Sequence, residues 1–133
     1  NTNVNTFKIS YKMVRNPADA SYSIHIDSQY PIEIVAIQSL VGVELMEIDS
    51  SIAILSLCPE DPDQKNALSA TYRFVDSNIS KFEIKIRTIE GQYGDLNCFV
   101  IPNAQPKTCQ AFNIPIKPLS LHEIHTVKSI RSC

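Results

Sequence analysis

The chain contains 133 residues, of which 44% are hydrophobic and 20% are charged, and its formal net charge is −2. A chain of this length buries about two-thirds of its unfolded surface, which is enough for one core and leaves no room for a second domain. It has only three glycines and no Gly-rich phosphate-binding motif. A slightly acidic chain without a long basic run is not expected to bind nucleic acid.

We therefore expect a single domain over residues 1–133, with its core at about residues 5–127. The chain begins with Asn1 rather than Met, which suggests a piece excised from a larger protein or a processed chain. No signal segment is evident, and no apolar run approaches the length of about 18 residues that a membrane helix needs.

The aliphatic residues favour β-structure. Eighteen isoleucines and eight valines stand against eight leucines, and β-branched side chains suit pleated, half-buried surfaces. The eight prolines fall at segment edges or in strands that must be peripheral. These features predict an all-β protein.

In chain order, the first half alternates apolar and polar residues with a period of two, as strands with one exposed face do. Strands are predicted at residues 7–13, 22–26, 32–39, 43–48 and 52–58. The third is the densest in apolar residues, as expected of a central strand covered on both faces. A turn is predicted at residues 16–19 and a polar loop at 59–66.

The second half continues this pattern, most regularly where Phe82, Ile84 and Ile86 alternate with charged residues. Strands are predicted at residues 68–74, 82–86, 96–101 and 110–116. Residues 119–127 form a last strand or, near Leu119–His125, a short helix. Eight or nine short strands at spacings of about 8 to 12 residues indicate an antiparallel β-sandwich.

The cysteines, at positions 58, 98, 109 and 133, contain no Cys-x-x-Cys pair. A domain of this size does not need covalent cross-links. We therefore expect free, buried thiols in preference to one disulfide, and a disulfide in preference to a metal site.

Catalytic, metal and cofactor sites are not expected. His122 and His125 would point to opposite faces of a strand. The acidic loop with Glu60, Asp61 and Asp63 lacks the spacing of ligand residues and the glycine that a calcium-binding loop has. No nucleophile elbow or zinc-protease motif occurs. The chain is therefore not expected to be an enzyme.

One strand carries a basic outward face formed by Lys81, Lys85 and Arg87, which Lys8 and Lys12 extend. Charged side chains protect sheet edges and favour solubility, and that is the preferred interpretation. The alternative is that these three residues bind a partner or an acidic peptide.

Several segments, in order, resemble a known family. They are residues 66–73 (NALSATYR), 82–94 (FEIKIRTIEGQYG), 105–110 (QPKTCQ) and 116–122 (IKPLSLH). The succession resembles the Bardet–Biedl syndrome 7 family of BBSome subunits over roughly residues 19–127. Residues 59–66 and 111–115 diverge from that family, and the tail at 128–133 matches nothing in it.

The resemblance implies an immunoglobulin-like sandwich similar to the γ-adaptin ear. It also implies a non-catalytic role, without a cofactor, in a coat-like complex that carries membrane proteins to and from the cilium. The implied partners are other BBSome subunits, notably the one related to the Bardet–Biedl syndrome 2 protein, and cargo peptides, with only indirect membrane contact. The implied location is the cytoplasm and, within the complex, the cilium, basal body and ciliary membrane.

An extracellular immunoglobulin-like adhesion or receptor domain is the alternative function. It requires a disulfide between two of the four cysteines and a glycan on Asn78, which begins the sequon Asn78-Ile79-Ser80. Self-association through an exposed edge strand is a third alternative.

Overall fold

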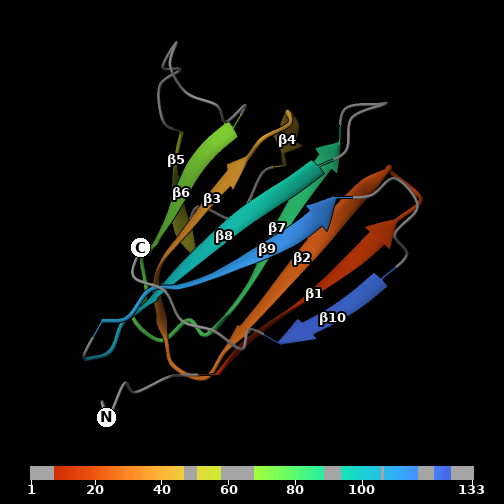
Figure 1. Ribbon diagram of the computed structural model, residues 1–133. Helices are drawn as coiled ribbons and strands as arrows, with labels where there is room; N and C mark the ends of the chain where they lie inside the picture. Colours follow the sequence, from red (N-terminus) through yellow and green to blue (C-terminus); the bar gives the residue numbers. More distant parts are fainter. Residues whose placement is uncertain are drawn as a thin grey trace.

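The computed structural model describes residues 8–46, 51–57, 68–88, 94–105 and 107–116, and the backbone of 122–126. These residues form ten β-strands in two five-stranded antiparallel sheets that pack face to face (Figure 1). The all-β sandwich predicted from the sequence is confirmed. It has ten described strands, where eight or nine were predicted. The predicted polar loop at residues 59–66 lies outside the described residues.

The first sheet, here called sheet A, has the strand order β10-β1-β2-β7-β4. Its strands are β1 (Ile9–Asn16), β2 (Ser21–Ser28), β4 (Val43–Leu45), β7 (Lys81–Thr88) and β10 (His122–Thr126). β10 lies in the segment for which a strand and a short helix were alternatives. It forms a strand because β1 offers it an antiparallel partner, with Ser10 opposite Thr126 and Val14 opposite His122.

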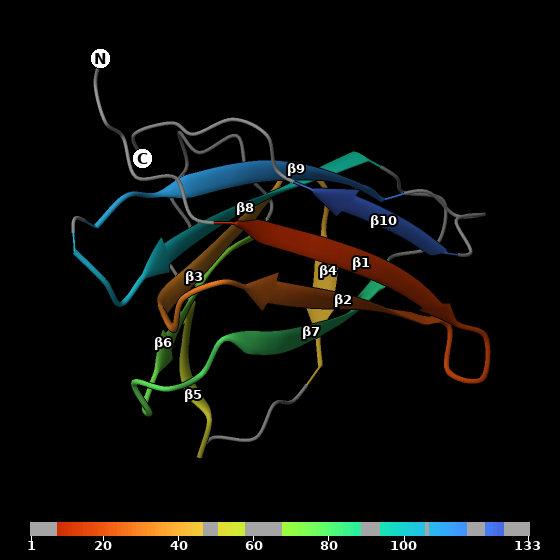
Figure 2. The ribbon, with the colours of Figure 1, turned by 90° about the horizontal axis from the view of Figure 1, so that it is seen from below.

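The second sheet, here called sheet B, has the strand order β5-β6-β3-β8-β9. Its strands are β3 (Ile32–Ser39), β5 (Ala53–Leu57), β6 (Leu68–Phe74), β8 (Gly94–Pro102) and β9 (Gln110–Ile116). Figure 2 shows the two sheets as separate layers, with β5 at one margin of sheet B and β9 at the other.

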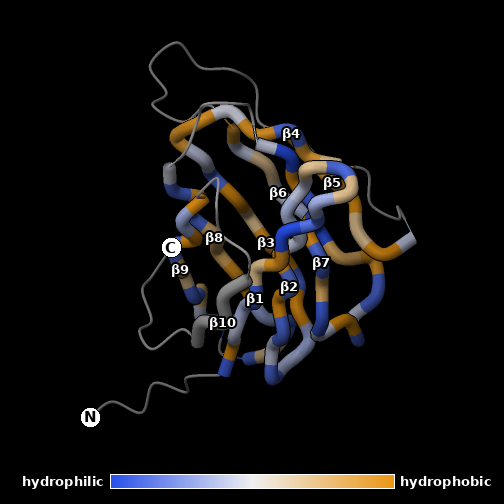
Figure 3. The backbone as a smooth tube through the Cα atoms, turned by 90° about the vertical axis from the view of Figure 1, so that its right-hand side faces the viewer, coloured by the Kyte–Doolittle hydropathy of each residue, from blue (hydrophilic) through white to orange (hydrophobic). Residues whose placement is uncertain are grey.

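The core lies between the two layers and consists mainly of the inward-facing isoleucines, valines and aromatic residues. The alternation of hydrophobic and hydrophilic residues along the strands, visible in Figure 3, places one set of side chains inside and the other outside. Ile24, Ile37 and Ile84 are fully buried in this core. Burying a side chain of this size stabilises the fold by about 1.5–3 kcal/mol relative to leaving it exposed.

Aromatic contacts join the two sheets near both margins. Tyr11 of β1 stacks on Phe112 of β9, with ring centroids 4.7 Å apart. On the other side, Phe82 of β7 meets Tyr72 and Phe74 of β6 edge-on, at 5.0 and 4.7 Å. Such pairs each contribute about 0.5–1.5 kcal/mol beyond the area they bury.

β3 is central in sheet B, as its composition predicts, since it lies between β6 and β8. Coverage of both its faces was expected, and that part is wrong. Val35 and Ile37 on the inner face are fully buried, whereas Ile34 and Ala36 on the outer face are only half-buried. Side chains of the neighbouring strands supply the partial cover of the outer face, because no further described layer lies over it.

Candidate functional site

The candidate site is the outer face of sheet A, which carries all three residues singled out as partner-binding candidates. Phe82, Ile84 and Ile86 of β7 are buried, and the alternate side chains therefore point outward. Lys81, Lys85 and Arg87 all belong to this outward set, as the sequence predicts.

The preferred interpretation of these cations as edge protection does not fit the topology. β7 is not an outermost strand of its sheet, because it lies between β2 and β4. The short strand β4 pairs with the C-terminal end of β7, placing Glu44 opposite Arg87 and Leu45 opposite Ile86. Lys85 and Arg87 therefore have another role in the fold.

That role is to bind the turn between β1 and β2. The Lys85 ammonium nitrogen lies 2.9 Å from an Asp19 carboxylate oxygen. The Arg87 Nε–H group donates a hydrogen bond of 3.3 Å to the backbone carbonyl of Asp19. Residues 17–20 form the turn predicted by Asn16-Pro17-Ala18-Asp19, and it includes Ala20 in the left-handed region at φ 57°.

Hydroxyl groups beside the turn complete a small polar network. Ser21 Oγ donates a hydrogen bond of 2.6 Å to the Asp19 carboxylate. Asn16 Nδ2 donates to Ser21 Oγ and Ser23 Oγ at 3.1 and 2.9 Å, which satisfies two buried hydroxyl groups on this face. Hydrogen bonds from Ser21 and Lys85 lower the pKa of Asp19 from 3.8 to about 2.

Arg87 also faces an acidic residue of β4. One of its guanidinium nitrogens lies 3.6 Å from Glu44 Oε1. Both groups are substantially exposed, and an ion pair of this kind contributes only about 0–1 kcal/mol. Two of the three candidate cations therefore already have an acidic partner within the domain.

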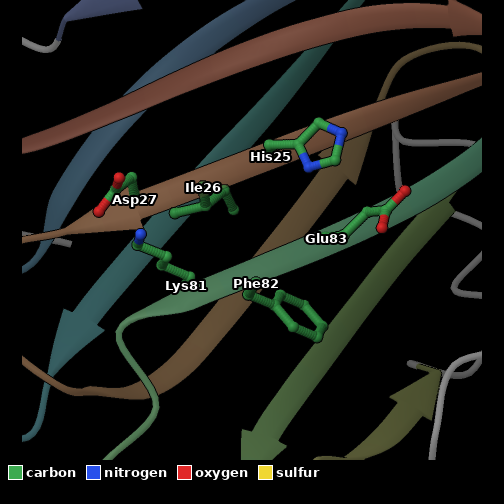
Figure 4. A pocket seen from close by; sticks show the side chains of 6 residues that line it. All are labelled: His25, Ile26, Asp27, Lys81, Phe82 and Glu83. Carbon is green, nitrogen blue, oxygen red and sulfur yellow. The ribbon is translucent and has the colours of Figure 1, made fainter.

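Lys81 differs from the other two. Asp27 of β2 lies opposite it in the ladder, and the Lys81 ammonium group is turned towards Asp27 in Figure 4. Within the described part of the chain, no ion pair involves Lys81. Its ammonium group is therefore the most available of the three to a partner.

A shallow hollow of about 270 Å³ lies beside Lys81. It is lined by residues of β2 and β7, namely His25, Ile26, Asp27, Lys81, Phe82 and Glu83 (Figure 4). A second hollow, which shares Asp27 and includes Lys8 and Gln29, adjoins it towards β1. Both hollows lie at the end of sheet A where β2 ends and β7 begins.

The charge of this face differs from what the sequence predicts. Described cations on it are Lys8, Lys12, Lys81, Lys85 and Arg87, and described anions are Asp19, Asp27, Glu44 and Glu83. The three cations of β7 point outward as predicted, but the surface around them carries charges of both signs. The surface is mixed because Glu83 belongs to β7 itself and because β2, β4 and the turn at 17–20 bring further carboxylates next to β7. The sequence of β7 reveals only Glu83.

Nothing in the described residues forms a metal-binding cluster. No three His, Cys, Asp or Glu side chains of the described part are placed to hold a metal ion. No membrane-spanning helix occurs among those residues either. The loop acids Glu60, Asp61 and Asp63 lie outside the described residues, as do the side chains of His122 and His125.

The cysteines depart in part from the expected free thiols. Cys98 is free and fully buried in the core, where burial raises the pKa of its thiol. Cys109, by contrast, is disulfide-bonded. Cys58 and Cys133 lie outside the described residues.

Comparison with known proteins gives matches that agree with one another. The family model described as BBS7 GAE domain matches residues 5–113. The BBSome complex member BBS7 of Mus musculus is 45% identical over 121 residues, which cover 90% of this chain and 17% of the mouse protein. The BBSome complex member bbs-7 of Caenorhabditis elegans is 29% identical over 117 residues, covering 88% of this chain and 16% of the worm protein. The chain thus spans about a sixth of the length of these relatives.

Proposed function

Because the chain belongs to the BBS7 GAE domain family, we propose that it is a non-catalytic protein–protein interaction domain of a BBSome subunit. In this role it contributes to assembly of the coat-like complex that carries membrane proteins to and from the cilium. The observation that carries the proposal is the family match, which extends over residues 5–113. The sandwich supports it, because its rigid layers present outer faces and edge strands on which a partner can dock.

The proposed partners are other BBSome subunits, notably the one related to the Bardet–Biedl syndrome 2 protein, and cargo peptides. Membrane contact is indirect in this proposal, and the location is the cytoplasm and the ciliary compartments that the complex visits. We further propose that the domain is a single folding unit within a longer subunit. The small share of the mouse and worm relatives that the chain spans supports this.

The proposed contact surface is the outer face of sheet A around Lys81, Lys85 and Arg87. The hollow beside Lys81 offers both charges and apolar atoms to a partner, with His25, Phe82 and Glu83 in its lining. Mixed-charge surfaces of this kind favour partners with a complementary charge pattern, and they set specificity more than affinity.

The test is charge reversal in the intact subunit, followed by co-purification with the other BBSome subunits. Lys81→Glu is the most direct single variant, because Lys81 forms no ion pair among the described residues and its reversal therefore breaks none. The triple variant Lys81→Glu, Lys85→Glu, Arg87→Glu should weaken co-purification further. Lys107→Glu is the matched control, since Lys107 is an exposed cation that pairs with Glu33 at the start of β3 in the other sheet.

The expected result is reduced recovery of partner subunits with Lys81→Glu and unchanged recovery with Lys107→Glu. Equal recovery with all variants, measured on protein of unchanged thermal midpoint, would refute the contact surface. Loss with Lys107→Glu as well would show that charge reversal acts on the fold or on solubility.

The extracellular alternative is favoured by two observations. Cys109 is disulfide-bonded, and Asn78 is exposed in the turn between β6 and β7. The family match favours the BBSome role. Titration of thiols in the unfolded protein, purified without reductant from the native source, separates the two: four reactive thiols support the BBSome role, and two support the extracellular alternative.

A further inference from the structure

The edge strand β5 lacks the features that protect the other edges of the sandwich. Its sequence, Ala53-Ile54-Leu55-Ser56-Leu57, contains no charge and no proline. The other edge strands each carry such a residue, namely Glu44 in β4, Pro115 in β9 and Glu123 in β10. Natural proteins block free edges with such residues, because an unprotected edge pairs readily with another strand.

The hydrogen-bonding pattern identifies which backbone groups of β5 face outward. The Val75 N–H group donates to the Ile52 carbonyl at 3.0 Å, and the ladder continues from Ala53 opposite Phe74 to Leu57 opposite Ala70. In an antiparallel ladder, pairs that exchange hydrogen bonds alternate with pairs that do not. The N–H and C=O groups of Ala53, Leu55 and Leu57 therefore point away from β6, and no described residue lies beyond them.

The side chains along this edge are apolar and exposed. Ile54 points to the outer face of sheet B with 57% of its surface exposed, and Leu57 is 63% exposed. In the same row across the outer face, Arg73 of β6 separates Ile54 from Ile34 of β3, which is half-buried. A strand added beside β5 would cover part of the apolar surface of Ile54 and Leu57.

One positive charge marks the outer face beside this edge. Arg73 of β6 lies between Ile54 of β5 and Ile34 of β3 in the row across the sheet. It is exposed, and within the described part of the chain it has no ion pair. A strand added beside β5 lies about 9.5 Å from β6, a distance that an extended arginine side chain and a carboxylate span together.

From these observations we infer that the outer edge of β5 is a strand-addition site for an extended segment of a partner protein. The segment carries aliphatic side chains on the inner side, next to Leu55 and Leu57. On the outer side it carries a carboxylate that pairs with Arg73. A second copy of this chain fits less well, because residues 53–57 contain no acidic side chain to offer to Arg73. The site is on the opposite sheet from Lys81 and is tested separately from it.

The test uses the 133-residue chain and an acetylated, amidated peptide of the sequence Thr-Val-Asp-Val-Asp-Val-Thr. Amide hydrogen exchange is measured with and without peptide. When nine-tenths of the protein molecules are bound to peptide, exchange at Ala53, Leu55 and Leu57 should slow roughly tenfold. The reason is that these amides exchange only in the remaining one-tenth of molecules, which are free of peptide. Exchange at Ile54 and Ser56 should change little, since their N–H groups already face β6.

Three changes test the contacts separately. Arg73→Glu should weaken binding of the peptide by about twofold to fivefold and should favour a peptide with lysine in place of aspartate. Leu57→Pro removes one outward N–H group without removing a bond to β6, and it should lower affinity at unchanged thermal midpoint. Lys107→Glu, which reverses an exposed cation beside β9 at the opposite margin of the same sheet, should leave peptide binding unchanged.

The inference is overturned by unchanged exchange at the three outward residues at millimolar peptide. It is also overturned if the aspartate and lysine peptides bind equally well to both the parent chain and Arg73→Glu. If hydrogen exchange at the same three amides slows as the protein concentration rises, in the absence of peptide, the edge binds a second copy of the chain instead.

Discussion

Two buried tyrosines provide a sharp test of how this core is stabilised. The Tyr72 hydroxyl is buried and has no hydrogen-bond partner among the described residues, and burial raises its pKa to about 12. The Tyr11 hydroxyl donates a hydrogen bond of 3.2 Å to the carbonyl of Asn113, across the two sheets. Removing each hydroxyl with phenylalanine keeps the ring and its packing, so the pair of variants isolates the polar group.

The two substitutions should change stability in opposite directions. A buried polar group without a partner costs about 1–3 kcal/mol, so Tyr72→Phe should raise the free energy of unfolding by about 1 kcal/mol or more. Tyr11→Phe removes a formed hydrogen bond and leaves the Asn113 carbonyl without that donor, so it should lower stability by about 0.5–1.5 kcal/mol. The ring contacts of Tyr72 with Phe82 and of Tyr11 with Phe112 are retained in both cases.

The assay is urea unfolding of the parent chain and both variants, with the slope of the transition checked for constancy. For a domain of this size, 1 kcal/mol corresponds to a shift of roughly 3–6 °C in the thermal midpoint, which gives an independent measurement. If Tyr72→Phe destabilises the protein as much as Tyr11→Phe does, the Tyr72 hydroxyl has a partner and the reasoning fails.

Three further outcomes are expected. The contribution of Asp19 to stability should be fully present above pH 4 and lost as the pH falls towards 2, because its pKa is lowered from 3.8 to about 2 in the folded state. Asp19→Asn should therefore approach the parent chain in urea stability over that range, and a constant difference would contradict the assignment. Phe82→Ala should cost about 3–5 kcal/mol through the cavity it leaves between the sheets, and a loss below 1 kcal/mol would contradict the packing. Cys98 should resist alkylation in the folded protein and react on unfolding, as mass spectrometry of the labelled peptide would show.

The alternation within single segments predicted most of the fold. The inward set of β7 follows from apolar residues at every second position, because the two faces of a strand differ in exposure. The central position of β3 follows instead from its high density of apolar residues. The last strand was ambiguous because residues 119–125 lack a clear period, and pairing with β1 decides their conformation. Tertiary contact thus settles what local sequence leaves open.

The candidate site was only partly predictable for a related reason. The outward direction of Lys85 and Arg87 is a property of β7 alone, and the sequence shows it. Their acidic partners, Asp19 and Glu44, come from segments about 66 and 43 residues away in the chain. Which strands become neighbours is set by the topology of the whole sandwich, and the sequence of one strand contains no signal for it.

The aromatic contacts near both margins of the sandwich have a mechanical consequence. Because Tyr11 and Phe112 join the sheets on one side while Phe82, Tyr72 and Phe74 join them on the other, neither sheet can pivot on the other without breaking one of these contacts. The outer face around Lys81 and the free edge of β5 are therefore held at a constant separation and orientation. Two partners docked at these places would be kept in a fixed relation, and the domain would serve as a rigid spacer between them.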